Sequence, residues 1–358
     1  MLHDLIASVR AELAHLTAVQ PSDRPWQMPF AASLAIGLPL LLAAAFDHLE
    51  AGLIASLGGL VFLYLPQTPL AHRMVTIMVC AFAMVTCYAI GTLSGLVPVL
   101  MMPVFVLLAI AVTMLCRFYR IGPPGSLFFV MAAAIGAYTP LAAAEVPRAV
   151  GLNALGAMLA CVVALAYSLI MLRVRPPKPV EPLPPATFDF VVLDAVLIGV
   201  FVGLALAIAQ LLQMEKAYWV PVSCLAVIQG ATLRAVWVRQ LHRIVGTAFG
   251  LVVAWGVLGL GLGAWGLALT MMVLACLIEV LVVRNYAMAA VLITPMTILL
   301  AEAGALGGLD PAPLVLARFY DTVLGCLVGL AGGACIHNAA VRERAGRWLR
   351  KLLPARLR

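Results

Sequence analysis

Long apolar segments, separated by short polar or basic turns, follow one another along nearly the whole chain. Segments of about 20 apolar residues are long enough to cross a bilayer as α-helices. Their apolar positions are continuous rather than alternating, which argues against the strands of a β-barrel. The pattern therefore predicts an all-α polytopic membrane protein with about twelve transmembrane helices. The predicted helices cover residues 29–46, 51–66, 73–94, 97–117, 125–143, 147–172, 191–212, 217–232, 241–260, 263–283, 285–303 and 314–337.

Three further segments lie outside the predicted helices. Residues 1–28 place apolar side chains at helical spacing, which is typical of an amphipathic segment on the membrane surface. Residues 174–188 form a proline-rich cytoplasmic linker that cannot continue a helix. Residues 339–358 form a basic cytoplasmic tail, whose composition fits an interfacial helix held by anionic lipid.

The two halves of the chain repeat a pattern of charges. His72-Arg73 and His242-Arg243 are 170 positions apart, and so are Arg148 and Arg318. We therefore predict two six-helix repeats, at residues 29–173 and 189–338. An even number of helices in each repeat leaves both in the same orientation, so the pseudo-twofold axis should run along the membrane normal.

Basic residues fix the expected orientation. If the N-terminus is cytoplasmic, 19 of the 22 Lys and Arg residues fall on that side of the membrane. The other side then keeps only Arg148, Lys216 and Arg318. Since Lys and Arg accumulate on the cytoplasmic side of membrane proteins, both termini are predicted to be cytoplasmic.

Composition agrees with a membrane protein and excludes other classes. The chain is 65% hydrophobic and 10% charged, whereas soluble domains carry about 25% charged residues. The net charge of +7 comes from helix ends and the tail, which argues against nucleic-acid binding. No phosphate-binding loop, zinc-protease or serine-nucleophile motif occurs, and no cysteines form a Cys-x-x-Cys pair. We expect no enzyme activity, no cofactor and no metal site.

Ionisable residues within predicted helices are therefore the first functional candidates. Arg318 and Asp321 lie three residues apart and should share one helix face. Arg318 could bind a carboxylate, and Asp321 could compete for Arg318 or take a proton. A purely structural ion pair is the alternative interpretation. Arg148 and Asn153 occupy corresponding positions in the first repeat, and they join the predicted substrate site.

Other polar and aromatic residues have two interpretations each. His72, Arg73, His242 and Arg243 could form a cytoplasmic vestibule for anions, or the arginines could simply anchor helix ends.

Tyr218 and Trp219 could belong to an interfacial aromatic belt, or they could form an aromatic wall for a planar substrate. Gln229, Thr294 and Thr297 could line a path within the membrane. Asp194 and Glu279 lie near predicted cytoplasmic helix ends, where each could relay protons or pair with an arginine.

The segment from Trp219 through Gly250, the triplet Arg284-Asn-Tyr286 and the motif Arg318-x-x-Asp321-Thr322-x-x-Gly325 resemble the FUSC, or aromatic acid exporter, family. This family includes the fusaric acid resistance proteins and is related to plant aluminium-activated malate transporters. The resemblance is good over 190–338 and weaker over 29–172, where Thr76-Ile77 replaces the Gly246-Thr247 step.

The resemblance implies a bacterial inner-membrane exporter of organic anions, especially aromatic carboxylates, and we expect proton-coupled secondary transport. A passive organic-anion channel is one alternative, and a non-transporting membrane scaffold or lipid-binding protein is another. Some relatives work with a periplasmic adaptor protein. The expected partners are therefore a small organic anion and the lipid bilayer, with an adaptor and a homodimer as further candidates.

Overall fold

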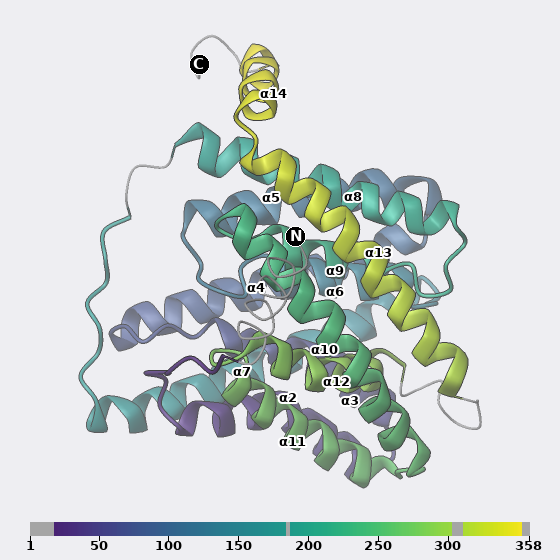
Figure 1. Ribbon diagram of the computed structural model, residues 1–358. Coiled ribbons are helices and arrows are strands. Elements are labelled where there is room, and N and C mark those ends of the chain that lie inside the picture. The colour runs from purple at the N-terminus through teal and green to yellow at the C-terminus, as the bar shows by residue number, and fades with distance from the viewer. Residues whose placement is uncertain (1–17, 184–186, 303–310, 353–358) are drawn as a thin grey trace, which may run out of the picture.

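A computed structural model describes residues 18–183, 187–302 and 311–352, and every regular element in those ranges is helical (Figure 1). In the first half the helices are α2 (Gln27–Ala45), α3 (Leu49–Gly59), the 3-10 helix η1 (Leu60–Tyr64), α4 (Leu70–Gly95), α5 (Pro98–Phe118), α6 (Leu127–Tyr138) and α7 (Val146–Val174). In the second half they are the π-helical turn η2 (Asp189–Leu193), α8 (Asp194–Leu211), α9 (Trp219–Ile228), α10 (Leu233–Gly259), α11 (Ala264–Leu281), α12 (Tyr286–Glu302), α13 (Pro311–His337) and α14 (Ala339–Leu352).

Within the described residues, eight helices are long and apolar enough to cross a membrane. They are α2, α4, α5, α7, α8 with η2, α10, α11 and α13. Their outer surfaces are strongly apolar. Phe82, Val99 and Val252, for example, expose 75%, 85% and 69% of their surface. So many large exposed apolar side chains fit a lipid environment and not water, and the predicted polytopic α-helical membrane fold is confirmed.

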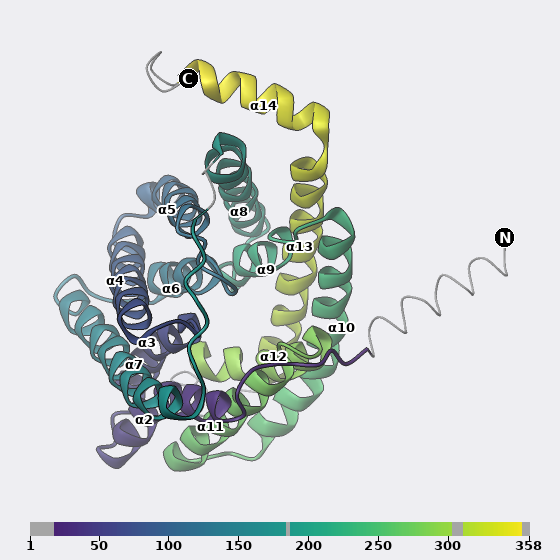
Figure 2. The ribbon, with the colours of Figure 1, turned by 90° about the vertical axis from the view of Figure 1, so that its left-hand side faces the viewer.

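Four apolar helices are shorter, namely α3 with η1, α6, α9 and α12. Figure 2 shows them enclosed by the longer helices. α9 has ten residues, all of them buried, and at 1.5 Å per residue it is about 15 Å long, half the thickness of the hydrocarbon core. A helix this short does not span the bilayer by itself, and the surrounding long helices bury it at the centre of the fold.

The predicted extent of one central helix was wrong. The sequence predicted a helix over 125–143, but α6 covers only Leu127–Tyr138. Pro123 and Pro124 precede it, and Thr139 is followed by Pro140, which disfavours helical backbone at Thr139. The predicted helix 285–303, by contrast, agrees with α12, which covers Tyr286–Glu302.

Equivalent helices pack in equivalent pairs in the two halves. In the first half α3 packs on α7, and α4 packs on both α6 and α7. In the second half α9 packs on α13, and α10 packs on both α12 and α13. The halves meet where α5 contacts α8 and where α11 contacts α2, so these interfaces are equivalent as well.

Two glycines at matching helix pairs allow close approach of the backbones. A Cβ atom at Gly156 on α7 would collide with the Ala55 carbonyl on α3, and one at Gly325 on α13 would collide with the Val220 carbonyl on α9. Both α7 and α13 therefore need a residue without a side chain where they cross the short helix, and both carry glycine at that point.

The segments outside the predicted repeats agree with the prediction in part. α7 continues to Val174, so the linker begins at Arg175, and it then runs extended toward α8 (Figure 2). The basic tail contains a helix, α14, with Trp348 63% exposed. Most of the predicted amphipathic N-terminal segment lies outside the described residues, and the described residues 18–26 are not helical.

Candidate functional site: a central cavity

A cavity of about 1220 Å3 lies between the two halves of the chain. Its walls include residues of α5, α9, α10, α11 and α12, together with the turn from Arg120 to Ser126. Small-molecule sites usually measure about 300–1,000 Å3, so a one-ring organic acid and several waters would fit. The short helix α9 presents Trp219, Val222 and Ala226 to this space.

Cations outnumber acids on the cavity wall. The lining arginines are Arg24, Arg117, Arg120, Arg239 and Arg243, and the lining acids are Asp194 and Glu279. His242 and His337 also line it. Within the described ranges, no three His, Cys, Asp or Glu side chains come together as a metal site would require. The wall is therefore suited to an anion.

Both lining acids are held by arginines across the interfaces between the halves. Arg24 Nη1 donates to Glu279 Oε2 at 2.9 Å, where the segment before α2 meets α11. Arg117 Nη1 donates to Asp194 Oδ2 at 2.8 Å, where α5 meets α8. Arg342 on α14 also binds Asp194. The sequence left pairing and proton relay open for these two acids, and the structure shows that both are paired.

Two arginines converge on Tyr286, at the start of α12. Arg243 is only 6% exposed; its Nη1 donates to the Tyr286 hydroxyl at 3.1 Å and its Nη2 to Ser223 Oγ at 3.3 Å. The Arg239 guanidinium carbon lies 5.7 Å from the centre of the Tyr286 ring. Neither arginine has a carboxylate partner in the described part of the chain. Planar guanidinium groups beside an aromatic ring are well suited to an aromatic carboxylate.

Trp219 separates the cavity from a third arginine. Trp219 lines the cavity and is 1% exposed. The Arg318 guanidinium carbon lies 3.8 Å from the centre of the Trp219 ring, and Arg318 Nη2 donates to Thr297 Oγ1 at 3.3 Å. Arg318 is not among the residues that line the cavity. The indole ring therefore lies where it could open or close access to Arg318.

The aromatic-belt interpretation of Tyr218 and Trp219 is wrong, because belt residues face lipid headgroups and these two side chains are 7% and 1% exposed. Tyr218 packs against Trp219 and, across the interface between the halves, against Tyr138, with ring centres 5.1 and 5.6 Å apart. Helix α9 lies in the interior, which the apolar pattern alone did not reveal.

The other predicted substrate-site residues lie in different surroundings. Arg148 is exposed near the start of α7 and does not line the cavity. Asn153 is fully buried, and its Nδ2 donates to the Ile54 carbonyl at 3.3 Å between α7 and α3. Asp321 is also fully buried, three residues after Arg318 on α13.

The four predicted vestibule residues do not come together in the structure. His242 and Arg243 line the central cavity. His72 is exposed, with Nδ1 2.8 Å from Thr68 Oγ1, and Arg73 lines a second, smaller cavity. The structure therefore brings the second-half pair to the central site and leaves the first-half pair elsewhere.

A polar patch on the cavity wall joins the two halves. Gln229 Nε2 donates to Ser126 Oγ at 3.3 Å, and Thr113 Oγ1 donates to the same oxygen at 3.0 Å. Gln229 and Thr297 line the cavity, whereas Thr294 donates to the Ala290 carbonyl and does not line it. No sequence motif marks Ser126 and Thr113, because only folding brings them together with Gln229.

The match to a known family lies in the second half of the chain. Residues 195–332 match the model of a family described as fusaric acid resistance protein-like. Over 142 residues the chain is 31% identical to the uncharacterized membrane protein YvaC of Bacillus subtilis. This alignment covers 40% of the present chain and 22% of YvaC. Over 136 residues the chain is 30% identical to the uncharacterized protein YhfK of Escherichia coli. This second alignment covers 38% of the present chain and 19% of YhfK. The matched segment thus spans about a fifth of each of these two relatives.

No solved structure matches the chain. The family match runs from α8 into α13 and contains two of the motifs that carry the resemblance, Trp219 to Gly250 and Arg318 to Gly325. The resemblance inferred from those motifs is confirmed over residues 195–332, which match the model of the fusaric acid resistance protein-like family.

Proposed function

We propose that this protein exports organic anions, aromatic carboxylates in particular, by proton-coupled secondary transport. The observation that carries the proposal is the central cavity, on whose wall Arg120, Arg239 and Arg243 have no carboxylate partner in the described part of the chain. Cations within a membrane protein are costly unless they are paired. A bound organic anion would supply the missing negative charge.

Two parallel six-helix repeats, over 29–173 and 189–338, are the architecture we assign to this transporter. The equivalent helix pairs in the two halves support it. The positions of the short helices support it too, because they are the second and fifth helices of each half. Transporters built from repeats commonly bind substrate at the repeat interface, among discontinuous helices.

We place the protein in the bacterial inner membrane with both termini in the cytoplasm. In that orientation Arg24, Arg117, Arg120 and Arg239 surround the cytoplasmic end of the cavity and would concentrate anions there. Residues at the opposite helix ends, such as Lys216, do not line it. A cavity facing the cytoplasm is the state that would load an exporter.

In this mechanism the substrate carboxylate first binds Arg243 and Arg239, and its ring packs against Tyr286 and Trp219. Movement of the Trp219 indole would then expose Arg318 to the carboxylate. Protonation of Asp321, one turn along α13, would change how strongly Arg318 holds the substrate and so favour release. We therefore assign the coupling of proton movement to substrate release to Arg318 and Asp321.

The salt bridges Arg24–Glu279 and Arg117–Asp194 close the two interfaces between the halves on the cavity side. Rocking of one repeat against the other would require these contacts to open and re-form. A passive channel would instead need an open arginine-lined path, and neither Arg148 nor Arg318 lines this cavity. The adaptor protein and the homodimer stay predictions.

A cellular retention assay tests the proposal. The protein is expressed in a host that lacks exporters of this kind, and retention of labelled aromatic acids is measured with and without a proton gradient. We expect lower retention only when the gradient is present. Equal retention with and without the protein would refute export of these acids.

A further inference from the structure

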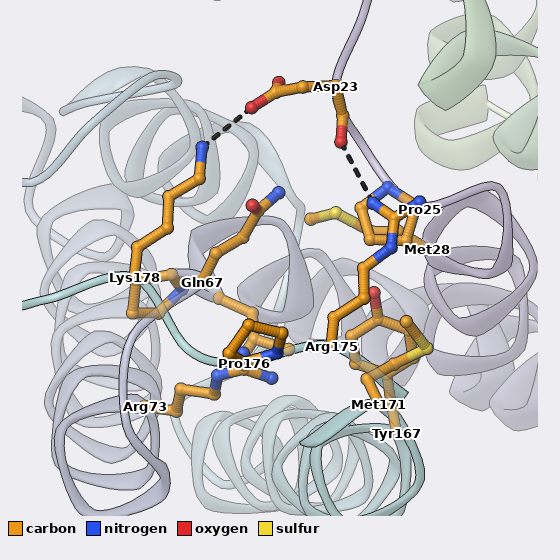
Figure 3. Close-up of a pocket in the computed structure, with 12 residues that line it drawn as sticks. Asp23, Pro25, Met28, Gln67, Arg73, Tyr167, Met171, Arg175, Pro176 and Lys178 are labelled. Carbon is orange, nitrogen blue, oxygen red and sulfur yellow. Dashed lines mark hydrogen bonds and ion pairs between the residues drawn. The ribbon is translucent and has the colours of Figure 1, made fainter. Parts of the chain in front are cut away.

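A second cavity, of about 260 Å3, lies in the first half and shares no lining residue with the central cavity. Three separate stretches of chain build it: residues 23–28, which lead into α2, residues 65–73, which lead from η1 into α4, and residues 167–178, which lead from α7 into the linker (Figure 3).

Positive charge dominates this cavity. Arg73, Arg175 and Lys178 line it, and Asp23 is its single lining acid. Lys178 Nζ lies 2.7 Å from Asp23 Oδ2, so that carboxylate is already engaged. Arg175 Nη1 donates only to the Asp23 main-chain oxygen, at 3.4 Å. Two positive charges, on Arg73 and Arg175, are left without a carboxylate in the described part of the chain.

Arg73 is the buried component of the site. It is 6% exposed, and its Nε donates to the Thr68 carbonyl at 2.6 Å. That is the one hydrogen bond its guanidinium makes within the described residues, which leaves the two terminal nitrogens for a ligand. A buried guanidinium without an anion is costly, so its retention at the cavity wall points to a bound anion.

The proline-rich linker holds the cavity together. The Lys178 main-chain N–H donates to the Gln67 carbonyl at 2.8 Å, and its side chain binds Asp23. These contacts join the linker to the η1–α4 turn and to the segment before α2. Figure 3 shows the side chains of Lys178 and Arg175 reaching Asp23 from the linker, with Gln67 between them.

We propose that this cavity binds a phosphate monoester dianion, either soluble or as the headgroup of a phosphatidic acid-type lipid. A monoester carries a charge of about −1.5 to −2 near pH 7, which balances Arg73 and Arg175, whereas one carboxylate would leave a cation unpaired. Phosphate oxygens also accept from several guanidinium donors at once. The site does not depend on the transport proposal.

Binding to the purified full chain in a nonionic detergent tests the site. Dioleoyl phosphatidic acid is the lipid probe, phosphatidylglycerol with the same acyl chains is its singly charged control, and inorganic phosphate is the soluble probe. We expect phosphatidic acid to bind more tightly than phosphatidylglycerol at pH 7.5. Arg73→Gln and, independently, Arg175→Gln should weaken binding by at least about tenfold, the loss expected for one charge-assisted hydrogen bond.

Arg173→Gln is the matched control, because Arg173 is an exposed arginine near the same helix end and lies outside the cavity. Its affinity should equal that of the wild type. Binding of the lipid probe alone identifies a lipid headgroup, and binding of phosphate alone identifies a soluble ligand. The proposal is overturned if neither probe binds, if phosphatidylglycerol binds as well as phosphatidic acid, or if both cavity variants retain wild-type affinity.

Discussion

Replacing Arg243 with glutamine should impair export far more than it impairs folding. The change removes two hydrogen bonds, to Tyr286 and to Ser223, but it also removes a buried charge that has no carboxylate partner in the described part of the chain. Hydrogen bonds to charged groups contribute about 1.5–3 kcal/mol each, and relief of the desolvation cost offsets much of that loss. We therefore expect a net change in stability of no more than about 2 kcal/mol.

Loss of the substrate contact has no such compensation. A charge-assisted hydrogen bond from Arg243 to a carboxylate should contribute about 1.5–3 kcal/mol, which corresponds to roughly 10- to 150-fold in kcat/KM at 1.4 kcal/mol per decade. Proteoliposome export of a labelled aromatic carboxylate measures this ratio, and the melting temperature reports stability separately. Arg234→Gln is the control, because Arg234 is an exposed residue of the same helix. Export by Arg243→Gln at the wild-type rate, or a loss of export explained entirely by unfolding, would contradict this role.

Three further predictions concern the interfaces, the packing and the second cavity. A double-mutant cycle on Arg24 and Glu279 should give a coupling of about 1 kcal/mol or more, since Glu279 is buried; the exposed pair Lys178–Asp23 should give a clearly smaller coupling, because solvent screens it. Gly325→Leu should lower the melting temperature sharply or prevent folding, because its side chain meets the Val220 carbonyl, whereas Gly151→Leu, which has open space around it, should be tolerated. Phosphate should bind the second cavity more tightly as the pH rises from 5.5 to 7.5. Lys178 lowers the pKa of Asp23, so that carboxylate stays ionised over this range, and only the ligand, with a second pKa near 6, gains charge; titration calorimetry at the two pH values measures the change.

The sequence predicted the order and approximate position of the helices well, because each apolar segment reports its own length locally. It failed where the interior mattered. Prolines around α6 shorten that helix, and the burial of α9 changes Tyr218 and Trp219 from expected interfacial residues into packed ones. Burial depends on which helices surround a segment, and the apolar pattern does not carry that information.

The candidate site was predictable only in part. The equal spacing of Arg148 and Arg318 suggested equivalent roles, yet Arg148 is exposed and Arg318 packs against Trp219. Glu279 pairs with an arginine 255 positions away, and Asp194 pairs with one 77 positions away. Contacts between residues so distant arise from the packing of one half on the other, and no local motif records them.

Transport by the purified chain in proteoliposomes tests the central claim most directly. Uptake of labelled 4-hydroxybenzoate and of its neutral isostere 4-hydroxybenzamide is compared with and without an imposed proton gradient. The account predicts gradient-dependent transport of the carboxylate and none of the amide, because the cavity wall provides cations for a negative charge. Equal transport of both compounds, or carboxylate transport that ignores the gradient, would contradict a proton-coupled organic-anion exporter.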